Sequence, residues 1–130
     1  MNYYSNDVPF ESLKGLTLTS IENDNDVVVF TADDGQKFIM YHDQNCCETV
    51  AVDDIAGELD DLIGSPILLA EEVTSGENPE GVTMEYQDSF TWTFYKLATI
   101  KGAVTIRWYG ESNGYYSEAV SFSQTDPKPA

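Results

Sequence analysis

Basic side chains are scarce in this sequence. The chain has 130 residues with six lysines and arginines against 23 aspartates and glutamates, so its formal net charge is -17 at pH 7. Residues 38–95 contain no lysine or arginine at all. Proteins that bind nucleic acid or an anionic membrane directly need these cations to displace counterions. The charge therefore disfavours both classes and favours a basic protein or a cation as the partner.

Long apolar runs and disulfide frameworks are also missing. No stretch approaches the roughly 20 apolar residues that span a bilayer, and Met1 to Tyr4 lacks the charged start and apolar run of a signal peptide. The only cysteines, Cys46 and Cys47, are adjacent. Because neighbours in sequence rarely bridge each other, we expect reduced thiols and a cytoplasmic protein.

The single histidine, His42, restricts the catalytic chemistry that is open to the chain. A Cys-His mechanism would use Cys46 or Cys47, but the spacing fits a half-buried histidine and two buried thiols equally well. Zinc ligation by these three is disfavoured, since consecutive residues of an extended segment point to opposite sides. Asp24-Asn25-Asp26 lacks the glycine and distal glutamate of a calcium loop. We therefore expect no catalytic residue, no metal and no cofactor.

Alternating apolar and polar residues predict strands over most of the chain. Residues 16–21, 27–30 and 37–41 are separated by turn residues, so they predict an antiparallel meander. Residues 89–100 also alternate, and Asn113-Gly114 is a strong hairpin signal because both residues accept positive φ. A sheet that stacks nucleobases pairs its aromatics with basic residues, which are few here, so we assign the inner-face aromatics to the core.

A helical period interrupts the strand patterns after residue 52. Ile55, Leu59 and Leu62 recur at helical spacing, with Asp53 as the expected N-cap and Gly64 at the C′ position. We therefore predict an α+β fold, in which one short helix packs on a twisted, mainly antiparallel sheet. The length fits a single domain over residues 16–124, with an N-terminal arm at 1–15 and a C-terminal tail at 125–130.

On that helix, Asp54, Glu58 and Asp61 would form one acidic stripe, with Asp60 at its edge. Four residues of helix rise roughly 6 Å, a pitch comparable with successive phosphates of a nucleic acid strand. Such a surface suits the groove of a DNA- or RNA-binding protein, although a solvated helix face explains the same residues. We predict a partner-binding surface that includes Asp54, Glu58, Asp60, Asp61, Glu71, Glu72, Tyr109, Tyr115 and Tyr116.

Four blocks stand out along the sequence, and they are YHDQNCCE from Tyr41, DIAGELDDLIG from Asp54, TWTFYK from Thr91 and RWYGESNGYY from Arg107. In this order they resemble a domain of unknown function encoded by phages, prophages and some bacteria. The resemblance covers residues 16–122 and brings no established activity. It implies a small accessory protein acting in a host cytoplasm. Together with the acidity, it suggests a DNA mimic or an anti-CRISPR-like inhibitor of a basic, nucleic-acid-binding host or defence protein.

Other function classes stay open. The chain can also be a structural module that self-associates through its sheet, for example as a homodimer, or a small metal-binding protein. General acid–base work by paired carboxylates depends on a cleft that a sequence does not show. Binding that falls steeply with salt distinguishes the inhibitor, a salt-indifferent oligomer distinguishes the module, and loss of function on His42→Ala distinguishes an enzyme.

Overall fold

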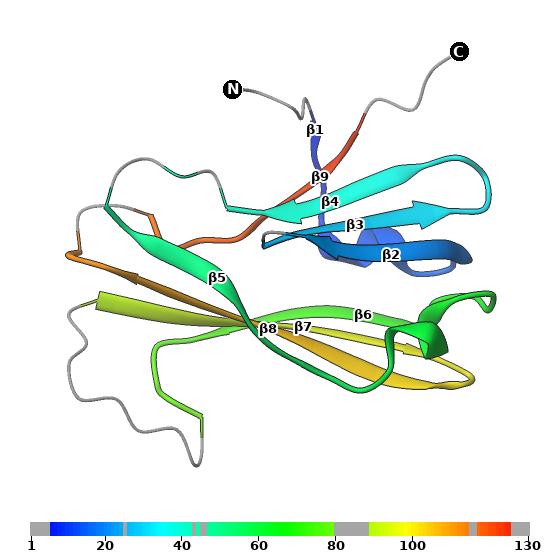
Figure 1. Cartoon of the computed structure of the whole chain (residues 1–130). Coiled ribbons are helices and arrows are strands. Elements are labelled where there is room, and N and C mark those ends of the chain that lie inside the picture. Colours follow the sequence, from blue (N-terminus) through cyan, green and yellow to red (C-terminus); the bar gives the residue numbers. More distant parts are fainter. Residues whose placement is uncertain are drawn as a thin grey trace.

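The chain folds as a β-sandwich of two antiparallel sheets, seen one above the other in Figure 1. The computed structural model describes residues 6–24, 26–42, 44, 47–79, 89–114 and 117–125. The first sheet has the order β1 (Asn6–Asp7), β9 (Ser121–Gln124), β4 (Lys37–Tyr41), β3 (Val27–Ala32), β2 (Leu18–Asp24). The second has the order β5 (Thr49–Ala56), β8 (Gly102–Ser112), β7 (Ser89–Thr99), β6 (Leu69–Ser75).

Tight turns connect the strands that the sequence predicts as a meander. β2 pairs with β3 and β3 with β4, all antiparallel, as expected. Gly35 in the β3–β4 turn has φ 92°, a conformation that glycine adopts without strain. Its amide donates to the Ala32 carbonyl at 3.1 Å. Local turn chemistry therefore explains this half of the first sheet.

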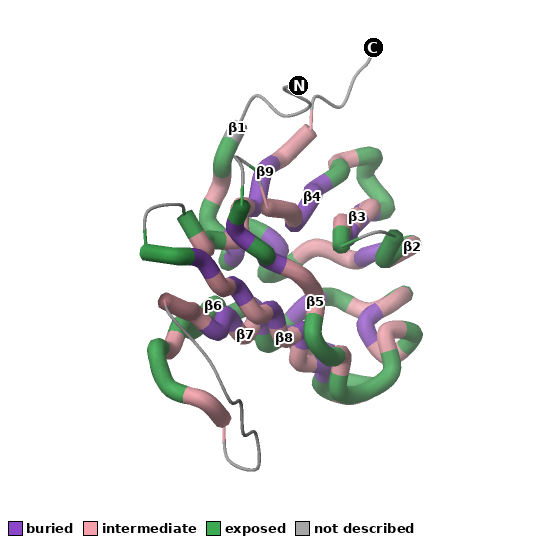
Figure 2. The backbone as a smooth tube through the Cα atoms, turned by 60° about the vertical axis from the view of Figure 1, so that its left-hand side comes forward, coloured by how far each residue is buried: buried purple, intermediate pink, exposed green. Residues whose placement is uncertain are grey.

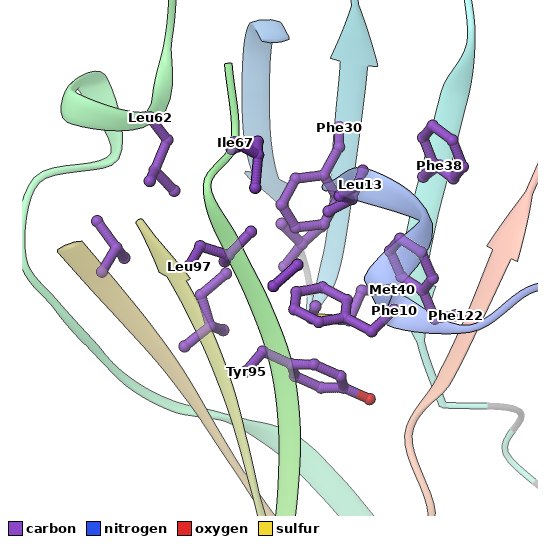
Figure 3. Packing of buried hydrophobic residues seen from close by; sticks show 14 of the residues in the cluster. Phe10, Leu13, Phe30, Phe38, Met40, Leu62, Ile67, Tyr95, Leu97 and Phe122 are labelled. Carbon is purple, nitrogen blue, oxygen red and sulfur yellow. The ribbon is translucent and has the colours of Figure 1, made fainter. Parts of the chain in front are cut away.

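The core lies between the two sheets (Figure 3). Phe38 and Phe122 stack with ring centroids 5.6 Å apart in the first sheet. Phe10 belongs to the 3-10 turn η1 (Phe10–Leu13), and its ring centroid lies 4.7 Å from that of Tyr95 in the second sheet. Phe10 and Leu13 are 1% and 0% exposed, and burying each side chain contributes about 1.5–3 kcal/mol. Part of the segment assigned to an N-terminal arm thus packs inside the sandwich.

The predicted helix over residues 53–64 is wrong, and so is the α+β fold class. β5 occupies the first half of this segment, and only the 3-10 turn η2 (Leu59–Leu62) follows it. Within the described ranges, η1 and η2 are the only helical turns, so the protein is all-β there. No helix in this part of the chain is long and apolar enough to cross a membrane.

Tertiary pairing overrides the helical period in this segment. β5 forms a continuous ladder with β8 from Thr49 to Ala56, apart from one bulge. Gly57 then turns the chain with φ 108°, and a Cβ there would lie 2.5 Å from the Ala103 carbonyl oxygen. Ile55 and Leu62 still pack on the core, but from a strand and a 3-10 turn. The helical spacing therefore identifies residues that pack on the core, but it predicts the wrong secondary-structure element.

β7 alternates as predicted, and its odd-numbered residues lie on the core side of the sheet. Tyr95 and Leu97 belong to the core, whereas Phe90, Trp92 and Phe94 lie on the outer face of the sheet. Trp92 is fully buried there, 4.6 Å from the Tyr109 ring. Its Nε1 donates to Asn78 Oδ1 at 3.0 Å. The segment after β6 therefore contacts part of the outer face.

Candidate functional site

The edges of the two sheets meet on one side of the molecule, where β2 lies beside β5 and η2. The Val52 amide donates to Asp26 Oδ1 at 3.0 Å. Leu18 forms an isolated bridge with Ile63, and the Gly64 amide donates to the Leu18 carbonyl at 3.0 Å. These contacts join residues from different sheets into a single surface, and Figure 2 marks exposed residues along both β2 and β5.

This surface carries carboxylates from both sheets, and we call it the acidic edge. Its six carboxylates are all exposed, and they are Glu22, Asp24, Asp26, Asp54, Glu58 and Asp60. A groove of about 300 Å³ runs between β2 and η2. Glu22 lines it from β2, and Asp60 lines it from η2. A partner entering the groove therefore meets negative charge from both sheets.

The nearby cations are already engaged. The Arg107 guanidinium donates to Asp53 Oδ2 through Nε at 2.8 Å and Nη2 at 2.5 Å, and lies over the Trp92 ring. Lys101 Nζ donates to the Ile63 carbonyl. Across the described residues, no lysine or arginine forms an ion pair with a carboxylate of the acidic edge. Its negative field therefore extends into solvent, over a screening length of about 8 Å at physiological salt.

The structure brings together three of the four residues of the predicted acidic stripe. Asp54, Glu58 and Asp60 lie on the acidic edge. Asp61 does not, because its half-buried carboxylate covers Gly102, where a Cβ would approach Asp61 Oδ2 to 2.7 Å. The remaining members, Glu22, Asp24 and Asp26, come from the β2–β3 hairpin, where the sequence pattern predicts only a turn around Asp24 and Asp26.

Glu71 and Glu72 lie on β6, at the opposite edge of the second sheet. They point to opposite faces, and Glu71 is paired in register with Lys96. The Tyr95 hydroxyl donates to Glu72 Oε2 at 3.4 Å. Partial burial raises the pKa of Glu72, the Tyr95 hydroxyl opposes that rise and the Glu11 carboxylate adds to it. These two residues therefore belong to a region separate from the acidic edge.

The predicted tyrosine patch is described only in part. Tyr109 is half-buried on the outer face of β8, and its hydroxyl donates to Glu111 Oε1 at 3.2 Å. Tyr115 and Tyr116 lie outside the described residues. Tyr109 packs against Trp92, so its ring supports the outer face of the sheet as well as offering surface.

A buried pair that the sequence did not reveal joins His42 to Glu48. His42 Nε2 lies 2.8 Å from Glu48 Oε2, and the side chains are 5% and 0% exposed. His42 Nδ1 lies 2.7 Å from the Ala119 carbonyl oxygen. The pair thus ties the chain that follows β4 to the segment that precedes β9. Nothing in the spacing of these residues indicates the contact, because it depends on how the sheets stack.

The expectation of a reduced thiol is wrong at Cys47, which is disulfide-bonded. Cys46 lies outside the described residues. A Cys-His mechanism through Cys47 would require the thiol to be released first. Within the described ranges, no group of three or more histidine, cysteine, aspartate or glutamate side chains is placed to hold a metal ion.

Comparison with known proteins identifies a family for most of the sandwich. A family model described as a domain of unknown function (DUF7448) matches residues 11–122, from η1 into β9. No curated protein and no solved structure matches the chain. The match therefore covers both sheets apart from β1 and the end of β9, together with the acidic edge and the His42–Glu48 pair.

Proposed function

Because the chain belongs to the DUF7448 family, a domain of unknown function, we propose from its geometry that it is a non-enzymatic binding protein. Its acidic edge docks on the basic surface of a nucleic-acid-binding protein. One observation carries this proposal: six exposed carboxylates from two sheets lie on the acidic edge, two of them line its groove, and no described lysine or arginine pairs with them. Such a surface attracts a partner of opposite charge and repels nucleic acid.

The net charge of -17 supports a partner whose own ligand is a polyanion. A protein that binds DNA or RNA presents lysines and arginines along a groove, and rows of carboxylates at a sheet edge can occupy the same cations. In this proposal the protein is a phage-type accessory inhibitor, DNA-mimic or anti-CRISPR-like, that acts in the cytoplasm of a host cell. Occupation of the groove would exclude the nucleic acid by direct competition.

An affinity pull-down from host lysate at low and then high salt tests the proposal. We expect one basic, nucleic-acid-binding protein that is released by salt and by added duplex DNA or RNA, because both compete for the same cations. Recovery of partners that resist salt and nucleic acid alike would overturn the acidic edge as the docking surface.

A second candidate function is self-association through β6, and the exposed apolar residues of that strand favour it. β6 is an edge strand, and its outer face exposes Leu69 at 42% and Val73 at 36%. Unpaired edges with apolar side chains are templates for strand addition. Light scattering at low and high salt separates the two candidates. A dimer that persists in salt and is lost in Val73→Lys favours self-association.

A further inference from the structure

A second pocket lies at one end of the sandwich, away from the acidic edge. It has a volume of about 360 Å³ and lies between the inner faces of β6 and β7 and residues 117–120. Its polar lining consists of hydroxyls and two carboxylates, from Glu72, Thr74, Ser89, Thr91, Thr93, Ser117 and Glu118. Pockets of roughly 300–1,000 Å³ are typical of small-molecule sites.

The pocket wall around Glu118 is held by several independent contacts. Glu118 Oε1 accepts from Thr91 Oγ1 at 2.8 Å, and Oε2 accepts from Ser112 Oγ at 2.6 Å. The next residue, Ala119, is fixed through its carbonyl to His42 Nδ1. Gly110 lies directly behind, where a Cβ would approach the Glu118 carbonyl oxygen to 2.7 Å. The wall is therefore formed before any ligand arrives.

Among the described residues that line this pocket, two carboxylates have no lysine or arginine beside them. Burial tends to raise the pKa of Glu118, but hydrogen bonds from Ser112, Ser89 and Thr91 outweigh it and lower the pKa overall. Glu118 is therefore ionised at neutral pH, with only neutral donors around it. Glu72 adds a second carboxylate, and none of the described residues that line the pocket is basic.

Thr93 adds a further polar group to the pocket. It lines the pocket and is 2% exposed. Throughout the described chain, no hydrogen-bond partner is found for its hydroxyl, although every fully enclosed side-chain polar atom has one. The Thr93 oxygen is therefore not fully enclosed, and it can accept a hydrogen bond from a donor that enters the pocket.

We propose that this pocket binds an organic cation bearing N–H donors, either an alkylammonium or a guanidinium group. The Glu72 and Glu118 carboxylates hold its charge, and the Thr93 hydroxyl accepts one of its N–H groups. Ala119 and Val120 offer apolar contact to the attached carbon chain. A free amine or the side chain of a lysine or arginine in a protein presents this chemistry. The site is independent of the acidic edge.

An NMR titration of the full chain with agmatine, a butane chain bearing one guanidinium and one ammonium group, tests the proposal. We expect amide shift changes at residues 72–74, 89–93 and 117–120. Glu72→Gln should weaken binding about tenfold, the equivalent of 1.4 kcal/mol. Glu71→Gln is the matched control, because it removes the same charge from the opposite face of the same strand. It should change the affinity less than about twofold.

The shape-matched variant Thr93→Val tests the hydroxyl separately, with its amide spectrum confirming the fold. It should weaken agmatine binding several-fold. A tripeptide with a central arginine, blocked at both ends, distinguishes a protein side chain from a free cation as the natural ligand. If it binds as tightly as agmatine, the ligand is a protein side chain. If it binds more weakly, the ligand is a free cation. The proposal fails if the shifts fall on the acidic edge, if Glu72→Gln and Glu71→Gln behave alike, or if neutral glucose binds in the pocket and agmatine does not.

Discussion

The Val52 amide donates a 3.0 Å hydrogen bond to the Asp26 carboxylate, and this contact joins the edge strand of one sheet to the turn of the other. Asp26 has φ 59°, a left-handed conformation that aspartate tolerates better than most residues. The turn thus holds one carboxylate oxygen on β5 while Asp24 and Asp54 stay exposed on either side. The acidic edge is consequently a product of the packing of the two sheets.

Charge reversal on the acidic edge should abolish binding to a basic partner. The triple variant Asp24→Lys, Asp54→Lys and Glu58→Lys changes the net charge from -17 to -11, two units at each of three sites. We expect a loss of affinity of at least about a hundredfold, because repulsion replaces attraction across the docking surface. Calorimetry or surface plasmon resonance at several salt concentrations measures it.

The control for that experiment reverses three carboxylates near β6. Glu11, Glu71 and Glu77 are exposed, and their reversal gives the same net charge. Binding should retain most of its affinity, with a small loss from the weaker long-range field. Equal losses in both triple variants would show that total charge, and not the acidic edge, drives association.

Removal of His42 should destabilise the fold, because it leaves the fully buried Glu48 carboxylate without its ring partner. Breaking one side of a buried pair costs about 3–5 kcal/mol. Urea unfolding of His42→Ala at neutral pH measures the loss. The double variant His42→Phe with Glu48→Leu should recover much of the stability, since it removes the buried carboxylate together with the ring. A loss below about 1 kcal/mol in the single variant would contradict a structural role for the pair.

Gly57→Ala should destabilise the sandwich by about 2 kcal/mol or more. Gly57 has φ 108°, and a Cβ there would lie 2.5 Å from the Ala103 carbonyl oxygen, so both the backbone and its neighbour must shift. Gly76→Ala is the control, because its Cβ would meet nothing within 4 Å. Thermal unfolding should show a lower midpoint for Gly57→Ala alone. Equal midpoints would contradict the close approach of β8 at Gly57.

Stability should fall in acid partly through Glu118. In the folded state, burial tends to raise the pKa of Glu118, but hydrogen bonds from three hydroxyl donors outweigh that effect. The net result is a lowered pKa. A depressed carboxyl pKa contributes stability above the unfolded value of about 4.3, and this contribution is lost as pH falls through the folded value. Glu118→Gln should therefore be less stable than wild type at pH 7, and the difference should shrink near pH 3. Urea unfolding at both pH values measures it.

Glu72 should affect the pH dependence of stability in the opposite direction to Glu118. Its folded pKa is raised, chiefly by burial, so ionisation of Glu72 costs stability as pH rises through that value. Relative to wild type, the Glu72→Gln variant is expected to be slightly more stable at pH 7 than at pH 3. A loss at pH 7 would show that its carboxylate is compensated in the fold.

Local patterns in the sequence determined most of the strands and their turns. The strand period is two, so alternation locates β7 and β8 without reference to the rest of the chain. Gly35 and the polar residues around it specify the β3–β4 turn through backbone freedom alone. The excess of carboxylates, and hence the kind of partner the surface attracts, is likewise a property of composition.

Only the tertiary structure decided which element residues 53–64 form, which face of β7 is buried and which carboxylates meet. Ile55 and Leu62 satisfy a helical period and a strand followed by a 3-10 turn equally well. The ladder with β8 selects the second, because pairing partners far along the chain supply the hydrogen bonds. Asp26 and Val52, and His42 and Ala119, meet for the same reason: their contacts depend on how two sheets stack, which no local pattern encodes.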